Sequence, residues 1–270
     1  MKIREIIGAL EQFAPLSLQD SYDNAGLQIG LTEDADASGA LLCLDVTEEV
    51  VAEAQERGCN LIVSHHPLLF HPLKRIVGED YVQRTVVEAI RRGIAIYSAH
   101  TNLDNASGGV SWRMAEKLGI QDVRVLKSNS NYAPPSQGGD GGGSGAGIIG
   151  QLPEKMERED FIAWVKEVFD ADSVRYNSWT GEQVRTVALC GGAGAFLIPD
   201  AIAAGADVFL TGEIGYHRFF GYEDAIQLME IGHYESEQYN LEILREIITK
   251  ADPTLPVHTT TVETNPINYL

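Results

Sequence analysis

NLIVSHHP, residues 60–67, is a short apolar run followed at once by two histidines. A run of this length and composition predicts a strand covered on both faces, as in a parallel sheet. In such sheets, ligands gather outside the carboxyl ends of the strands, which is where His65 and His66 stand. The segment therefore predicts an α/β fold with an imidazole-rich metal site at a strand end, and a pair of exposed loop histidines is the simpler alternative. Because successive residues of an extended segment point in opposite directions, the two imidazoles suit two metal ions, or opposite sides of one cluster, better than a single ion.

Strand and helix signals alternate on both sides of this segment. Upstream, residues 40–46 (ALLCLDV) predict a strand, and Thr47 is a suitable N-cap for a helix that runs to about Arg57. Downstream, a helix at 81–92 and a strand at 94–99 continue the pattern. Further helices are expected at 1–13, 158–169, 198–204 and 241–250, and further strands at 184–190, 207–211 and 257–262. This alternation predicts right-handed crossovers and a largely parallel sheet.

The composition is that of a globular protein with a strong acidic bias. The chain has 270 residues, 44% of them apolar, which suits one large or two modest domains. The 20 Lys and Arg against 39 Asp and Glu give a net charge of −19, which disfavours broad nucleic-acid binding. Because the chain has neither a run of about 18 apolar residues nor a signal-peptide core, we expect no membrane span and a cytoplasmic location. Cys43, Cys59 and Cys190 are expected to be buried thiols of a reducing compartment.

Residues 134–147 (PPSQGGDGGGSGAG) interrupt the alternation, because half of them are glycine. Such a composition cannot form a core and predicts a flexible loop. Residues 145–150 also fit the pattern G-x-G-x-x-G, but no strand is predicted before them, so a dinucleotide site is not expected. The two halves of the chain contain similar segments: RGCNLIVSHH (57–66) resembles AGADVFLTGE (204–213) in its order of apolar and polar residues. Either any two αβ units look this alike, or two related α/β domains place their strand ends near one site.

A second strand end also carries polar side chains. Residues 98–104 read SAHTNLD, so His100 and Asp104 follow a predicted strand at a spacing of four. A carboxylate can complete a metal site of nitrogen and oxygen ligands, or orient a ligating imidazole. The alternative is that these polar residues only cap the helix that follows.

The segment GHYESE, residues 232–237, places His233 and Glu237 four apart. If the following helix has begun there, both side chains lie on one face, about one turn apart. Glu237 has two oxygens with which to bridge a pair of ions. An exposed acidic helix start, stabilised by the helix dipole, is the alternative.

Seven motifs follow one another in the chain: DNAGLQIG (23–30), SHHPLLF (64–70), AHTNLD (99–104), GAGIIGQL (145–152), TGEIGYH (211–217), GHYESE (232–237) and ETNPINYL (263–270). Together they resemble the Nif-three-like dinuclear-metal family, whose members are often labelled GTP cyclohydrolase type 2 homologues. The resemblance runs from end to end of the chain. Many relatives have Asp at the position of Glu213, and some carry an extra mid-chain domain where this chain has only its glycine-rich tract.

The resemblance implies a ligand set, a fold and an assembly. It matches the family's metal ligands to His65, His66, Asp104, His233 and Glu237, with Glu237 as the bridging carboxylate, and it places His100 and His217 in the pocket. It implies two interlinked α/β domains with largely parallel or mixed sheets, assembled as a ring-shaped homohexamer. We therefore expect a first domain of residues 1–127 plus about 235–270, a second of about 148–234, and the glycine-rich loop at 134–147.

These residues favour a metal-dependent hydrolase. Five nitrogen and oxygen ligands are too few to saturate two divalent ions, so positions for water or substrate remain, and Zn, Mn, Fe, Co and Ni all suit such ligands. Two close ions can activate water and stabilise an oxyanion, which suits a nucleotide or phosphoester-like substrate; GTP ring opening is the family label. The alternative is a non-catalytic metal-binding ring that acts through partners or metal handling. A general acid or base in the site, from His100, Glu235 or His217, would favour the enzyme.

Overall fold

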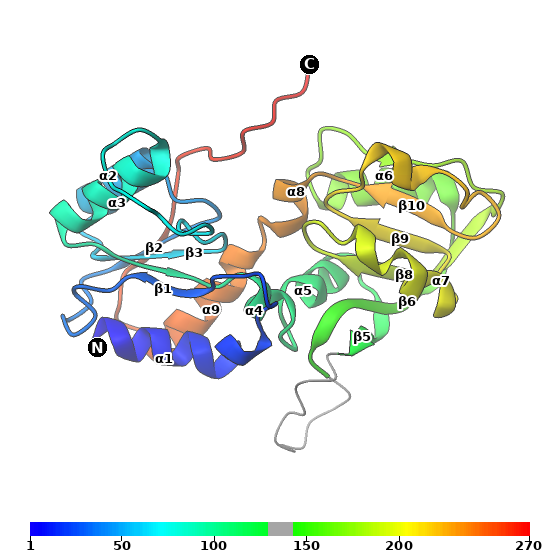
Figure 1. Cartoon of the computed structure of the whole chain (residues 1–270). Coiled ribbons are helices and arrows are strands. Elements are labelled where there is room, and N and C mark those ends of the chain that lie inside the picture. Colours follow the sequence, from blue (N-terminus) through cyan, green and yellow to red (C-terminus); the bar gives the residue numbers. More distant parts are fainter. Residues whose placement is uncertain (129–142) are drawn as a thin grey trace. The chain divides into compact units, whose positions relative to one another are not determined.

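The computed structural model describes residues 1–128 and 143–270, so residues 134–142 of the expected glycine-rich loop lie outside the described part. The chain forms two compact units (Figure 1). Unit 1 comprises Met1–Leu103 and Asn240–Pro266, and unit 2 comprises Asp104–Tyr239 and Ile267–Leu270. The domain boundaries expected from the sequence, near residues 127, 148 and 235, stay a prediction.

Unit 1 contains a five-stranded sheet in the order β1-β4-β3-β2-β11. Its strands are β1 (Gly26–Ile29), β2 (Ala40–Cys43), β3 (Leu61–Ser64), β4 (Ala95–Ser98) and β11 (Val257–Thr259). Its helices are α1 (Ile3–Phe13), η1 (Leu16–Leu18), α2 (Glu48–Glu56), α3 (Tyr81–Arg92) and α9 (Asn240–Ala251), while α4 (Thr101–Asp104) ends at the boundary of the unit. All neighbouring strands are parallel except β1, which is antiparallel to β4. Because Ser64 pairs with both Cys43 and Ser98, the residues that follow β2, β3 and β4 share one sheet edge.

Unit 2 contains a six-stranded sheet in the order β5-β6-β8-β9-β10-β7. Its strands are β5 (Gln121–Ser128), β6 (Gly145–Glu157), β7 (Arg175–Tyr176), β8 (Gln183–Cys190), β9 (Val208–Thr211) and β10 (Gln227–Glu230). Its helices are α5 (Val110–Lys117), α6 (Arg158–Val168), η2 (Ala195–Leu197), α7 (Ile198–Ala203), η3 (Tyr216–Phe219) and α8 (His233–Glu237). Strands β8, β9 and β10 are parallel, whereas β5, β6 and β7 pair antiparallel with their neighbours.

The two mixed sheets confirm the expected α/β class. The apolar runs form buried strands close to their expected bounds, and the three cysteines are free and buried, as predicted. The expected loop at 134–147 is too long by its last residues, because β6 already begins at Gly145. The G-x-G-x-x-G pattern therefore lies inside a strand that pairs with β8, and not in a turn that opens a helix. Among the described residues, no helix is long and apolar enough to cross a membrane.

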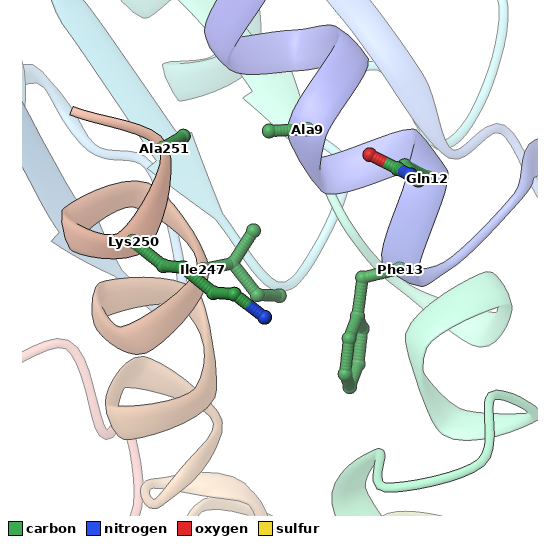
Figure 2. Close-up of a pocket in the computed structure, with 6 residues that line it drawn as sticks. All are labelled: Ala9, Gln12, Phe13, Ile247, Lys250 and Ala251. Carbon is green, nitrogen blue, oxygen red and sulfur yellow. The ribbon is translucent and has the colours of Figure 1, made fainter. Parts of the chain in front are cut away.

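Helix α9 lies beside α1 in unit 1, so residues near both ends of the chain help to build the same unit (Figure 1). Figure 2 shows Ala9 of α1 and Ala251 of α9 facing each other. A groove of about 470 Å³ lies between the helices, and its other lining residues are Gln12, Phe13, Ile247 and Lys250. Among the described residues, no histidine or carboxylate lines this groove, so they bring to it none of the side chains of the expected metal site.

A buried carboxylate in α2 holds the segment that follows β11. Glu53 is only 8% exposed, and its oxygens accept hydrogen bonds from the Thr261 amide (3.0 Å) and hydroxyl (2.9 Å) and from the Thr260 hydroxyl. The Arg57 guanidinium lies 2.8 Å away. Burial by itself would raise the pKa of Glu53, but these hydrogen bonds lower it to about 2.

We expect Glu53 to make the stability of unit 1 depend on pH below about 5. The carboxylate titrates near 4.3 in the unfolded chain and near 2 in the folded one, so its contribution is fully present above pH 5. That contribution, at most about 3 kcal/mol, is lost as pH falls from about 4 to 2. Urea unfolding in EDTA should therefore show Glu53→Gln well below wild type at pH 7, with the difference shrinking at pH 3. Glu56→Gln, an exposed change in the same helix, is the control; equal effects of both changes would contradict the assignment.

Candidate metal centre

The two histidines that directly follow β3 lie at a bend of the chain in unit 1. The strand ends at Ser64, and two buried hydroxyls then fix the backbone that follows. The Ser64 hydroxyl donates to the His66 carbonyl at 2.9 Å, and the Ser98 hydroxyl lies 2.7 Å from that of Ser64. The amides of His65 and His66 donate to the carbonyls of Cys43 and Leu44 in the neighbouring chain segment. These hydrogen bonds therefore hold the bend of the chain after β3.

Three imidazoles converge beyond this bend. The ring centroids of His65 and His66 are 4.9 Å apart, and that of His100 lies 5.3 Å from the first and 5.5 Å from the second. One ring nitrogen of each lies within 4.8 Å of the others. The expectation that His65 and His66 point in opposite directions is wrong, because the chain is no longer extended after Ser64. We call these three residues the histidine cluster.

Each imidazole of the histidine cluster is held through its Nδ1 atom. The Nδ1 of His65 lies 2.7 Å from the Ala99 carbonyl oxygen, which can only accept, so this nitrogen carries the proton. The Nδ1 atoms of His66 and His100 lie 2.9 Å from Asp45 and 2.7 Å from Asp23. When Nδ1 is the donor of a neutral imidazole, Nε2 has the lone pair that a metal needs. A carbonyl or carboxylate on the far nitrogen is the usual arrangement of metal-ligating histidines.

Asp23 ties the histidine cluster to the DNAGLQIG motif. One carboxylate oxygen accepts from His100, and the other accepts from the Thr101 amide (3.0 Å) and hydroxyl (2.5 Å). Burial would raise the pKa of Asp23, but the hydrogen bonds from His100 and Thr101 lower it to about 2. Asp23 therefore stays ionised at neutral pH and can hold the His100 ring in one orientation.

Unit 2 carries a second candidate group at the start of α8. Nε2 of His233 lies 3.1 Å from Oε2 of Glu237, so the two side chains share one helix face, as their spacing predicted. Nδ1 of His233 lies 3.2 Å from Oε1 of Glu213, which repeats the arrangement seen at His66 and His100. The Glu237 side chain is only 3% exposed. An imidazole and a buried carboxylate held this way are donors that a divalent cation accepts.

A glycine turn makes room for the Glu237 carboxylate. Gly192 follows β8, has φ +62, and a Cβ at this position would overlap Oε1 of Glu237 and lie 3.4 Å from Nε2 of His233. The Gly192 amide donates to the Ser236 hydroxyl at 3.0 Å, and its carbonyl accepts from the Gly212 amide at 2.9 Å. The Gly-Gly-Ala-Gly segment is therefore a tight turn after β8 against which α8 packs.

Of the remaining predicted residues, Asp104 belongs with the second group, since one of its carboxylate oxygens lies within 4.8 Å of one of Glu237, whereas Glu235 and His217 are in neither group. Asp104 is half-buried and ends α4, one helical turn after His100 along the chain. Glu235 is buried against Gly232, and its two-residue offset turns it away from the helix face of His233. His217 is exposed in η3, where its ring stands edge-on to that of Tyr216.

The structure also adds residues that the sequence interpretation missed. Asp45, Asp23 and Glu213 each hold an imidazole, and Gly192 leaves space for Glu237. Glu213 stands two residues after β9, so the strand-end signal that pointed to His65 applied to it as well, whereas Asp45 was placed inside the expected strand 40–46, which ends at Cys43 in the structure. Asp23 had no such signal, because it lies 77 positions before its partner His100.

The donor set fits divalent metal ions. It consists of imidazole nitrogens and carboxylate oxygens, and no thiolate joins the clustered groups of the described residues. Such donors suit Zn, Mn, Fe, Co and Ni alike. These features define the chain as an α/β protein of two mixed sheets, with clustered His and Glu side chains that could bind a metal.

Comparisons with known proteins agree with this class. The model of the DUF34/NIF3 (NGG1p interacting factor 3) family matches residues 1–266, so the chain belongs to that family. A relative from Clostridium perfringens is 32% identical over 88% of this chain and 87% of its own length, and one from Streptococcus pneumoniae is 34% identical over 87% and 85%. Both are named GTP cyclohydrolase 1 type 2 homolog. A NIF3-related protein of Bacillus cereus has a solved structure with a TM-score of 0.87 at 28% identity, covering 100% of this chain and 99% of that one. The family resemblance of the seven motifs is thereby confirmed.

Proposed function

We propose that this protein is a dinuclear-metal-dependent hydrolase acting on a nucleotide or phosphoester-like substrate. The observation that carries the proposal is the histidine cluster, in which each Nδ1 is held by a carbonyl or carboxylate oxygen, the arrangement usual for histidines of a metal centre. Three histidines that only stabilised the fold would not each need such an arrangement at one edge of the sheet. The names of the relatives make GTP the first nucleotide to test.

The proposed metal ligands are those that the motif resemblance implies: His65, His66, Asp104, His233 and Glu237. The motif resemblance supports this set, and the anchoring of His66 by Asp45 and of His233 by Glu213 supports the ligand role of those imidazoles. A bound pair of divalent ions would supply an acidified water and stabilise negative charge on the substrate.

His100 is the residue proposed to move the proton. Its Nδ1 is bound to the ionised Asp23, which orients the ring and stabilises the imidazolium that forms when Nε2 takes up a proton. Glu235 and His217 are weaker candidates, since the first is turned onto Gly232 and the second is exposed in η3.

We expect His100→Gln to separate chemistry from metal binding. Metal content should stay near two ions per chain, while kcat falls about 10²–10⁴-fold because the proton acceptor is gone. Elemental analysis and turnover are measured on the same preparation. If His100→Gln loses metal in proportion to activity, His100 is a ligand, and the proposed role as the proton acceptor is wrong.

The hydrolase proposal itself is tested by screening metal-loaded and metal-stripped protein against GTP, other nucleotides and phosphoesters. Turnover that needs the metal and is lost in the His100 variant supports it. Full metal occupancy without turnover of any of these substrates would instead favour the non-catalytic alternative, a binding protein that acts through partners or metal handling.

The homohexamer expected from the family resemblance is also part of the proposal. A closed ring of this chain should elute from a sizing column far above the 29.5 kDa of one chain. Light scattering on the eluted peak gives the mass directly. A single 29.5 kDa species at micromolar concentration would rule out the ring.

A further inference from the structure

We propose that a pocket beside the histidine cluster binds a flat aromatic or heteroaromatic ring of the substrate, so that the preferred substrates are aryl or nucleoside phosphoesters. The inference rests on the proposed function for the role of the histidines, but the pocket lies wholly within unit 1. We call it the ring pocket, and it is lined by Tyr22, Asp23, Asn24, Leu69, Phe70, Pro72, Leu73, Ile76 and Val86.

The ring pocket has the size and the character of a small-molecule site. Its volume is about 580 Å³, within the range of pockets that enclose a nucleoside-sized ligand. Most of its lining side chains are aliphatic or aromatic, and both oxygens of its carboxylate, Asp23, are already engaged by His100 and Thr101. A neutral flat ring therefore suits its interior better than a charged group does.

Phe70 joins the ring pocket to the histidine cluster. Its ring stands edge-on to His100 at a centroid distance of 6.1 Å and to Tyr22 at 6.5 Å. Phe70 is 38% exposed and Tyr22 is 64% exposed, so both offer aromatic surface for a ligand ring to stack on. A ring stacked on Phe70 would therefore lie next to His100, and the phosphate that it carries would reach toward the histidine cluster.

Hydrogen bonds from the DNAGLQIG motif hold the walls of the ring pocket together. The Asn24 amide donates to the Leu69 carbonyl at 2.7 Å, and the Gln28 side chain accepts from the Leu69 amide at 3.1 Å. Gln28 also donates to the Asn24 carbonyl at 2.7 Å. These bonds join β1 and the segment before it to the loop after β3, so the pocket is formed before any ligand arrives. The motif is thereby assigned a role: Asp23 orients His100 while Asn24 and Gln28 shape the pocket.

The lining also limits how well the ring pocket can distinguish one ring from another. Its apolar walls recognise the face of a ring, and stacking is tolerant of which base is present. We therefore expect phenyl phosphate, AMP and GMP to bind within a few-fold of one another, and all of them at least about tenfold more tightly than methyl phosphate.

The test measures binding by calorimetry on metal-loaded protein, with phenyl phosphate and methyl phosphate as a matched pair of probes. Phe70→Ala should lower the affinity for phenyl phosphate about tenfold or more and leave methyl phosphate unchanged, whereas Phe70→Trp should keep the preference for the aryl probe. Phe220→Ala, an exposed phenylalanine of unit 2, is the control and should change neither affinity. Circular dichroism and metal content are compared for every variant.

The outcomes separate this inference from the proposed function. Aryl preference that disappears in Phe70→Ala, without hydrolysis of either probe, supports the ring pocket and leaves the hydrolase proposal without support. Hydrolysis with equal affinity for phenyl and methyl phosphate in the wild-type protein overturns the ring pocket alone. An equal loss of affinity for both probes in Phe70→Ala also overturns it, because the Phe70 side chain would then only support the site that binds the phosphate.

Discussion

Glu237→Gln should leave the protein with almost no bound divalent metal. If the carboxylate bridges two ions, its negative charge is what lets two cations stand about 3.5–4 Å apart, and an amide cannot replace that charge. Both ions should therefore be lost together. Asp104→Asn should instead remove one ion first and leave about half occupancy at moderate metal concentration. The measurement is metal per chain after dialysis against a fixed concentration of free metal.

The control for this change is Glu167→Gln, an exposed position of α6 in the same unit, which should keep full occupancy. Circular dichroism should be the same for all three variants, because these side chains lie at strand and helix ends outside the apolar core. If Glu237→Gln keeps both ions while Asp104→Asn loses both, the bridging role belongs to Asp104.

Gly192→Ala should weaken metal binding although it changes no ligand. A methyl group at this position overlaps Oε1 of Glu237, so the carboxylate must move away from His233 or the turn after β8 must shift. Since a ligand displaced by about 1 Å loses most of its bond to a metal, we expect affinity to fall at least tenfold. Metal titration of the purified variant measures this directly.

A matched control separates the clash from the backbone strain. Gly205 has φ +75, close to the φ +62 of Gly192, but no atom of residues 1–128 or 143–270 lies within 4 Å of the place that a Cβ would take there. Gly205→Ala should lower the free energy of unfolding by about 1 kcal/mol, because alanine disfavours the left-handed conformation, and it should leave metal affinity unchanged. Equal metal affinity in the two variants would show that the Glu237 carboxylate does not depend on this turn.

The sequence was sufficient for the elements whose apolar pattern is unambiguous. Strands β2, β3, β4, β8 and β9 contain buried apolar runs, and within each sheet the polar residues that follow them could be predicted to lie together because parallel strands end at one edge. Strands β5 and β6 escaped prediction because their pairing depends on a neighbour and not on local apolar content.

The candidate site was predictable to the same limited extent. His233 and Glu237 share a helix face because of their spacing alone, which any α-helix imposes. The convergence of His65 and His66 depends instead on the hydroxyl pair of Ser64 and Ser98, which becomes a pair only when β3 and β4 align. The contact of Asp23 with His100 likewise needs the tertiary fold, since no local pattern joins residues so far apart.

The position of β11 near the end of the chain affects how unit 1 folds during translation. Strand β2 pairs with β3 early, but in the described part of the chain its other edge is covered by residues 257–259, which are made about 160 residues after β4. At about 5–20 residues per second this takes on the order of 10–30 s, during which the wholly apolar edge strand Ala40–Cys43 has no partner on that side. Unit 2, whose strands all lie between residues 121 and 230, completes its sheet first. An unpaired apolar edge of this kind is a template for wrong pairing, so the nascent first unit is the part of this chain most in need of a chaperone.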